Sequence, residues 1–369
     1  MEESWRALDG HRGAVWSVDW VRRSDGRLLL ASGSYDETVR IWDADSWECV
    51  AVLADHDRPV ASVRWVEPPG GGLLLATGDD DGIVRLWDAD TWQCSRVLVA
   101  GDDYQGRPSG IPLLRRFRRP PARLKRIRSV AWIADRPGAS LLVTASYDQT
   151  VRVWDAGSWR CRRVLTGHSL YVTAVAGART NDGQVLLASG AYDHTVRIWD
   201  VDSGECRQVL RCDASVISLA WATRPDGTLL LAAGADHGTV RIWDAQTWEC
   251  RHVLRDELDG THPTDVVVQA SSLDWIASPG AGAGMLLAGA NLLGNRVHVW
   301  DGERGTLRRV VDPIRALERP ANFSSNYVIA VAWADSTERD GVLRLAIGGG
   351  PDLRLSVWDV PLDRLAADA

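Results

Sequence analysis

A basic segment is the most chemically distinctive part of the chain. Residues 115–128, RRFRRPPARLKRIR, contain eight cations in fourteen residues and no acid, and Lys125 is the only lysine of the protein. A cluster of this kind can bind the phosphates of nucleic acid, a membrane surface, or the carboxylates of an acidic protein. The other residues that could do chemistry are eight histidines and six cysteines, as metal ligands or catalytic groups.

The charge of the whole chain argues against nucleic acid as the main ligand. The net charge is −7, and the nine cations between residues 107 and 128 contribute +9, so the rest of the chain carries about −16. Phosphate binding needs a positively charged face, so nucleic acid is a candidate ligand only at the basic segment itself. The composition, 45% hydrophobic and 25% charged, is that of a globular protein.

The ends and the apolar runs indicate no export and no membrane contact. The N-terminus, MEESWRALDGH, has acids where a signal peptide has positive charge, and no apolar run approaches the roughly 18 residues of a membrane span. We therefore expect a cytoplasmic protein. The near-absence of lysine beside abundant arginine, alanine and glycine indicates a GC-rich, bacterial genome.

A repeat of about 45 residues organises the chain. Its first copy reads LLLASGSYDETVRIWDADSWECVAVL and its fourth LLASGAYDHTVRIWDVDSGECRQVL, each with short β-rich segments separated by turn signals. The dipeptide Trp-Asp marks seven copies, with its tryptophan at 42, 87, 154, 199, 243, 300 and 358. Of 19 tryptophans, 17 follow this register. Large rings repeated at fixed strand positions predict packing rather than binding.

This pattern resembles the WD-repeat β-propeller family over almost the whole chain. The resemblance implies one all-β domain, residues 1–369, closed into seven four-stranded antiparallel blades around a central channel. The blades are expected near residues 10–54, 55–98, 125–166, 167–211, 212–255, 265–312 and 324–360, with a basic inserted loop at 99–124. SWRALDGH at the N-terminus is similar to SWRCRRVLTGH at 158–168. We therefore expect residues 4–9 to supply the outer strand of the last blade.

The resemblance also implies a buried polar tetrad in the well-kept blades. It links a histidine before the first strand, a hydroxyl on the second, an aspartate in the next turn and the Trp-Asp tryptophan. The matching residues are His11, Ser32, Asp36 and Trp42 in blade one; His56, Thr77, Asp81 and Trp87 in blade two; His168, Ser189, Asp193 and Trp199 in blade four. Blade three keeps Thr144, Asp148 and Trp154 without the histidine. Blades five to seven depart from the pattern, with Ala233, His237, Gly294 and Gly348 at tetrad positions.

Neither a catalytic triad nor a metal site is expected. Each His–Ser–Asp set resembles a triad, but recurrence in register indicates a structural role, since a triad needs one exposed nucleophile. Five cysteines each lie seven residues after a Trp-Asp tryptophan, one to a blade, too far apart to pair or to share a metal. Cys212 stands where blade five would have its histidine. No cofactor is implied.

The function is therefore expected on the surface, as a non-catalytic scaffold for a protein or peptide. The tyrosines, phenylalanines and inserted loops all map to the face on which the chain enters each blade, around the mouth of the channel. Tyr, Trp and Arg are enriched at interface hot spots. The candidate binding residues are Trp16, Tyr35, Arg115, Arg116, Arg118, Arg119, Arg126, Arg128, Tyr147, Tyr171, Tyr192 and Tyr327.

Several alternatives remain open at this stage. In one alternative, the tyrosines that precede a tetrad aspartate cap their blades and have no binding role. The basic loop could meet the protein's own acidic turn, Asp79–Asp81, instead of an acidic partner. Nucleic acid could still bind at residues 115–128. An enzyme site could occupy the degenerate blades five to seven, where His262 is an isolated candidate.

Overall fold

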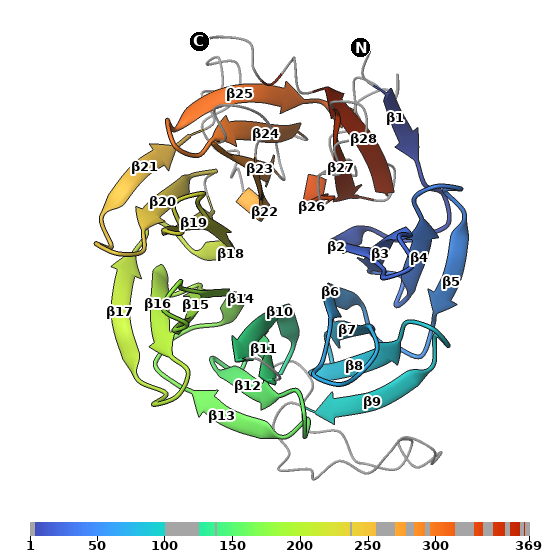
Figure 1. Cartoon of the computed structure of the whole chain (residues 1–369), viewed down its shortest axis with the longest axis horizontal. Helices are drawn as coiled ribbons and strands as arrows, with labels where there is room; N and C mark the ends of the chain where they lie inside the picture. The colour runs from blue at the N-terminus through green and yellow to red at the C-terminus, as the bar shows by residue number, and fades with distance from the viewer. Residues whose placement is uncertain are drawn as a thin grey trace.

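The fold is a closed ring of β-sheets. The computed structural model describes residues 4–99, 125–136, 139–236, 238–255, 270–277, 284–291, 296–313, 328–334, 342–350, 355–361 and 365. Within these residues, strands form seven four-stranded antiparallel sheets arranged around a central channel (Figure 1). The predicted all-β, seven-bladed propeller is confirmed.

In each of blades one to six, four strands consecutive in sequence run from the channel to the rim. Blade one is β2 (Val15–Arg22), β3 (Leu28–Ser34), β4 (Val39–Asp43) and β5 (Cys49–Leu53). Blade two is β6 (Val60–Val66), β7 (Leu74–Asp79), β8 (Ile83–Asp88) and β9 (Cys94–Val99). Blade three is β10 (Ile127–Arg136), β11 (Ala139–Ser146), β12 (Val151–Asp155) and β13 (Cys161–Leu165).

The second half of the ring continues in the same order. Blade four is β14 (Val172–Arg179), β15 (Val185–Ala191), β16 (Thr195–Asp200) and β17 (Cys206–Arg211). Blade five is β18 (Val216–Thr223), β19 (Leu229–Ala235), β20 (Val240–Asp244) and β21 (Cys250–Leu254). Blade six is β22 (Ala270–Ala277), β23 (Met285–Asn291), β24 (Arg296–Asp301) and β25 (Thr306–Val311). Blade seven is β26 (Val328–Trp333), β27 (Val342–Gly349), β28 (Leu355–Pro361) and β1 (Ser4–Ala7).

The residue pattern of each strand reflects its distance from the channel. All seven residues of β3, LLLASGS, are buried, because the second strand is covered on both sides by neighbouring blades. The first strand alternates, as in β18, VISLAWAT, because one side packs and the other faces the channel. The outermost strands, such as β5, are half exposed. Each of the five register cysteines begins an outermost strand, and all six cysteines are free thiols.

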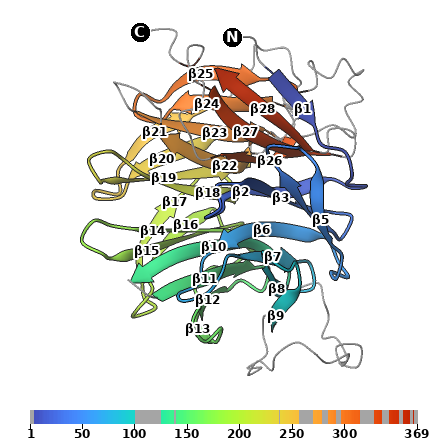
Figure 2. The same ribbon diagram turned by 45° about the vertical axis from the view of Figure 1, so that its right-hand side comes forward.

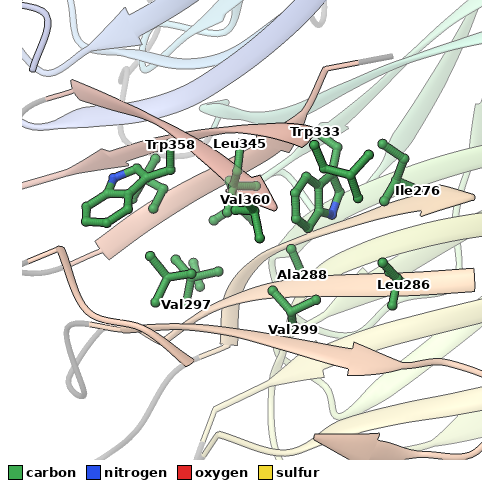
Figure 3. Close-up of a cluster of buried hydrophobic side chains, with 14 of the residues drawn as sticks. Ile276, Leu286, Ala288, Val297, Val299, Trp333, Leu345, Trp358 and Val360 are labelled. Atoms are coloured by element: carbon green, nitrogen blue, oxygen red, sulfur yellow. The ribbon is translucent and has the colours of Figure 1, made fainter. Parts of the chain in front are cut away.

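The hydrophobic core lies between blades rather than within them. Figure 3 shows the cluster in which side chains of blade six face those of blade seven. Its labelled members are Ile276, Leu286, Ala288, Val297 and Val299 from blade six with Trp333, Leu345, Trp358 and Val360 from blade seven. All seven Trp-Asp tryptophans are no more than 6% exposed. Each blade therefore depends on its neighbours for its core.

Tryptophans of the first strands also join blades by hydrogen bonds. The indole Nε1 of Trp65 in blade two donates to the carbonyl of Asp19 in blade one, at 3.1 Å. The indole of Trp20 in blade one donates to the carbonyl of Ala332 in blade seven, at 3.2 Å. Equivalent bonds are Trp221 to Ala176 and Trp275 to Ala220.

The ring is closed by strands from the two ends of the sequence. Strand β1 pairs antiparallel with β28 and is the outermost strand of blade seven, beside it in Figures 1 and 2. The ring of Trp5 stacks on that of Trp358, with centroids 5.8 Å apart. The amide of Leu8 donates to the carbonyl of Leu355, at 2.9 Å. The predicted N-terminal closing strand is confirmed.

Among the described residues, no helix is long and apolar enough to cross a membrane.

Candidate functional site

The tetrad of blade one has the predicted members. The ring of His11 is fully buried; its Nδ1 lies 2.9 Å from Asp36 and its Nε2 2.8 Å from the hydroxyl of Ser32. The same hydroxyl accepts from the indole of Trp42, at 2.9 Å. Burial alone would raise the pKa of Asp36, but hydrogen bonds from His11 and Thr38 outweigh it and hold that pKa below its usual range.

The tetrad of blade two uses a different aspartate from the one predicted. His56 contacts the hydroxyl of Thr77 as expected, at 2.7 Å, but its Nδ1 lies 2.8 Å from Asp79 rather than Asp81. Asp79 is 1% exposed and also accepts from Arg85, at 3.0 Å. Asp81 instead lies 3.4 Å from Arg58. The prediction of Asp81 was wrong. It rested on the alignment of Asp81 with Asp36 in the repeat, whereas the carboxylate that packs against His56 is that of Asp79, at the start of the turn.

Blades three, four and seven show how far the tetrad extends. In blade four, His168 contacts Asp193 at 2.8 Å and Ser189 at 2.7 Å, as predicted. Blade three keeps the bond from Trp154 to Thr144, at 3.2 Å. In blade seven, Gly348 was wrongly placed by one residue. In blade one, the tetrad hydroxyl of Ser32 lies opposite Val18 of the first strand. The equivalent residue of blade seven is Val331, and the residue opposite it is Ile347. Ser356 accepts from Trp358 in its place, at 3.0 Å.

The tetrads are enclosed, which argues against triad chemistry. The hydroxyls of Ser32 and Ser189 belong to fully buried residues and already bond both a histidine and a tryptophan. Burial lowers the pKa of His56 and of His168 and thereby favours the neutral form of both rings. No group of three or more His, Cys, Asp or Glu side chains within the described ranges could hold a metal ion.

The face on which the chain enters each blade, here the tetrad face, also carries the turns between second and third strands. These turns span residues 34–38, 79–83, 146–150 and 191–195. The amide of Tyr35 donates to the carbonyl of Ala14, just before β2, at 2.9 Å. Equivalent bonds are Asp80 to Pro59, Tyr147 to Arg126, Tyr192 to Tyr171 and Asp236 to Ser215. Each turn is thus fixed beside the segment that leads into its blade.

Three predicted tyrosines form one cluster on the tetrad face of blades three and four. The rings of Tyr147 and Tyr171 stack, with centroids 4.5 Å apart and planes at 10°. Tyr192 lies 6.0 Å from Tyr171 and 6.4 Å from Tyr147. Burial, with Tyr147 close by, raises the pKa of Tyr192 to about 12, so its hydroxyl stays protonated.

Arg128 connects this cluster to blade one across the mouth of the channel. Its guanidinium carbon lies 5.2 Å from the ring centre of Trp16 and 5.8 Å from that of Tyr147, within cation–π range of both. Trp16 in turn makes an edge contact with Tyr35, at 5.3 Å. Arg126 lies 6.0 Å from the ring centre of Tyr147. Seven of the predicted binding residues therefore form one continuous aromatic and cationic cluster: Trp16, Tyr35, Arg126, Arg128, Tyr147, Tyr171 and Tyr192.

The described end of the basic segment lies against the acidic turn of blade two. Arg126 is 3.5 Å from Asp80, and the carbonyl of Lys125 closely approaches Gly82. Burial raises the pKa of Asp80, an effect that Arg126 and Arg128 oppose. Its Oδ1 is buried and has no hydrogen-bond partner among the described residues. Part of the charge of the segment is thus directed to the protein's own carboxylates.

The channel below this cluster holds charged residues that the repeat pattern did not single out. A cavity of about 150 Å³ is lined by the first strands of the blades, including Trp16 and Arg128. Deeper in it, Arg64 donates to Asp19, at 3.0 Å. Asp274 lines the same cavity and is only partly exposed. Burial raises its pKa to about 7, although the amide of Trp333 donates to it at 2.7 Å.

Other predicted residues lie outside the described part of the chain. They are Arg115, Arg116, Arg118, Arg119 and Tyr327 among the binding candidates, together with His237, His262 and Gly294.

The residues that sequence reasoning missed are Asp19, Arg64 and Asp274. The sequence does mark these three residues. In the other blades, an alanine stands two positions after the channel-facing serine or alanine of the first strand, and Asp19, Arg64 and Asp274 replace that alanine.

Comparison with known families identifies the repeat. The family profile "WD domain, G-beta repeat" (WD40) matches residues 2–43, 47–88, 120–155, 159–200 and 204–244, which together make up more than half of the chain.

Comparison with curated proteins finds similarity over the length of one repeat. A segment of 43 residues is 56% identical to "Eukaryotic translation initiation factor 3 subunit I" of Coccidioides immitis (strain RS). Proteins of the same name are 48% identical over 44 residues in Aspergillus oryzae and 51% identical over 43 residues in Neosartorya fischeri. Each match covers 12% of this chain and 12% of the relative. The chain thus spans only a small part of the length of these relatives.

Proposed function

The chain belongs to the WD40-repeat family, and we propose that it is a non-catalytic scaffold that binds a protein or peptide on its tetrad face. Propellers of this family generally bind proteins. Fold alone does not determine function, so the proposal rests on the site.

The observation that carries the proposal is the continuous aromatic and cationic cluster around the channel mouth. Among the described residues the same backbone turn occurs in five blades, and Tyr35, Tyr147 and Tyr192 hold three of the five equivalent positions. Trp16 and Arg128 stand at equivalent channel-facing sites of blades one and three. Rigid aromatic rings beside arginine are the side chains that contribute most to protein interfaces.

The other function classes have less support among the described residues. A nucleic-acid site needs unpaired cations, whereas Arg126 faces Asp80 and Arg58 faces Asp81. An enzyme needs an exposed nucleophile or base, whereas the tetrad hydroxyls are buried. We therefore favour binding without catalysis, and without cofactor or metal.

The setting of the protein stays a prediction. The fungal relatives are by name subunits of a larger factor, which is consistent with a scaffold inside an assembly, but one shared repeat does not transfer their partners. A cytoplasmic location and a bacterial source are predictions from composition.

The proposal is tested by affinity capture from the native host with wild-type protein and with the variant Tyr171→Ala/Tyr327→Ala. We expect the variant to lose most of the captured partner, because Tyr171 stacks on Tyr147 at the centre of the cluster. The matched control is Val52→Ala, at a 48% exposed position on the outermost strand of blade one. Full retention of the partner by the tyrosine variant would reject the tetrad face as the binding surface.

A further inference from the structure

The mouth of the channel has an unusual arrangement, because its aromatic pair is already occupied by the protein's own arginine. The guanidinium of Arg128 lies between Trp16 and Tyr147 at 5.2 and 5.8 Å from their ring centres. A partner's arginine or lysine could not stack on both rings without displacing it. The cluster is therefore unsuited to recognise a cation at this position.

The donors of Arg128 are instead free to bind an anion. Stacking fixes the plane of the guanidinium and uses its faces, while its N–H groups point outward along the edges. Within the described parts of the chain, no acceptor bonds to these N–H groups, and the half-exposed side chain borders the central cavity. Planar guanidinium edges match carboxylates in bidentate geometry.

Two hydroxyls that line the same cavity as Arg128 can also act as hydrogen-bond donors. Ser17 and Ser62 line the cavity on adjacent first strands, and each Oγ accepts a backbone amide of the next blade at 3.0 Å, from Val63 and Val130 respectively. Their hydroxyl protons have no acceptor among the described residues, so they are available to a ligand. The upper channel thus presents donors on several sides.

Charge balance favours a singly charged ligand. Deeper in the cavity Arg64 is paired with Asp19, and at the rim Arg126 faces Asp80. Asp274 adds a carboxyl group rather than a cation. Arg128 interacts with Asp80 electrostatically, but it is the one cation of the described channel mouth that forms no ion pair with a carboxylate. A doubly charged phosphate would be repelled by Asp19 and Asp274, and only the charge of Arg128 would offset this repulsion.

We propose that the channel mouth binds one carboxylate of a partner, the side chain of a glutamate or aspartate that inserts between Arg128, Ser17 and Ser62. The cavity of about 150 Å³ is smaller than a drug-sized pocket and accommodates one side chain. The tyrosine cluster of blades three and four would support the flanking peptide. This inference rests on the proposed function, because it assigns the partner chemistry of the same face.

The test uses degenerate pentapeptide pools of defined centre, acetylated and amidated so that only side chains carry charge. The central residue is Glu, Gln or phosphoserine, and binding to the full-length protein is measured by fluorescence anisotropy. We expect the Glu pool to bind about tenfold more tightly than the Gln pool, as for loss of a charge-assisted hydrogen bond. Arg128→Gln should remove this preference, and Arg128→Lys should retain part of it.

The control variant is Arg27→Gln, because Arg27 lies in the turn between the first and second strands of blade one and, among the described residues, its ion pair is the exposed one with Asp25. It should behave as wild type, and melting curves should show that all three variants, Arg128→Gln, Arg128→Lys and Arg27→Gln, are folded. Equal binding of Glu and Gln pools, or a Glu preference that survives Arg128→Gln, overturns the carboxylate site but leaves the peptide-binding face standing. A preference for phosphoserine that Arg128→Gln removes overturns it in favour of phosphate. Failure of every pool to bind wild-type protein counts against the proposed function as well.

Discussion

Neighbouring aspartates in one turn have different roles, as blade two shows. Asp79, Asp80 and Asp81 are consecutive, yet Asp79 completes a buried network, Asp80 faces Arg126 at the rim, and Asp81 faces the half-exposed Arg58. A carboxylate that satisfies a buried cation is expensive to remove, whereas a surface pair contributes little.

Replacing Asp79 by Asn should therefore lower the free energy of unfolding by about 3 kcal/mol, because Arg85 would keep a buried charge without its carboxylate. Asp81→Asn, two residues away, should cost less, because its partner Arg58 is half exposed and stays solvated without the carboxylate. Urea denaturation of both variants measures the difference. Equal losses, or a larger loss for Asp81→Asn, would show that the tetrad assignment is wrong.

Asp274 predicts a pH dependence of stability. Burial raises its pKa in the folded protein to about 7, above the ordinary value of 3.8. The folded state then holds this proton more tightly than the unfolded state, so this group lowers the free energy of unfolding as pH rises from about 4 to about 7, with no further change above. Arg64, Asp19 and the amides of Trp275 and Trp333 are the other polar groups near it.

The Asp274→Asn variant cannot ionise and should lack this component. Its free energy of unfolding, relative to wild type, should rise steadily between pH 4 and pH 7. Chemical denaturation at several pH values provides the measurement, with Asp182→Asn, on an exposed hairpin, as the control. A difference that stays constant across this range would contradict a raised pKa.

At the scale of elements, each strand depends on a neighbour that is distant in sequence. The pairing of β1 with β28 brings residues 4–7 beside residues 356–359 and covers what would be an open edge of blade seven. The bond from Trp20 to Ala332 joins the first strands of the same two blades.

Deleting residues 1–9 should lower the melting temperature by about 10 °C or more and broaden the transition, because the edge of β28 and the ring of Trp358 become exposed. Deleting residues 1–3 alone leaves β1 whole and is the control. Differential scanning calorimetry measures both. An unchanged melting temperature for the longer deletion would mean that β1 does not close the ring.

The strands were predictable because each repeats the same local pattern, and local patterns decide where strands and turns lie. The tetrads of blades one and four followed for the same reason. The choice of Asp79 over Asp81 and of Ile347 over Gly348 could not follow, since register alone does not say how a turn packs or where a strand is offset. The position of Arg128 between Trp16 and Tyr147 depends on distances across the channel that no repeat pattern contains.

At the scale of the whole molecule, a nearly symmetric ring carries an asymmetric face. Blades one, three and four present aromatic rings on the tetrad face, whereas blade two presents its acidic turn and blade five Asp236. The repeat supplies stability through the cores between blades, and the substitutions on one face supply the surface that we propose binds a partner.

The central claim is that this surface binds peptide through its tyrosine cluster. The most direct measurement is a titration of peptides selected on the wild-type protein against the variant Tyr147→Ala/Tyr171→Ala/Tyr192→Ala, with Val209→Ala, at a 41% exposed position on the outermost strand of blade four, as the control. We predict that the triple variant, still folded by circular dichroism, binds these peptides at least tenfold more weakly, while the control binds as wild type. Equal affinity of the triple variant and wild type would contradict the account.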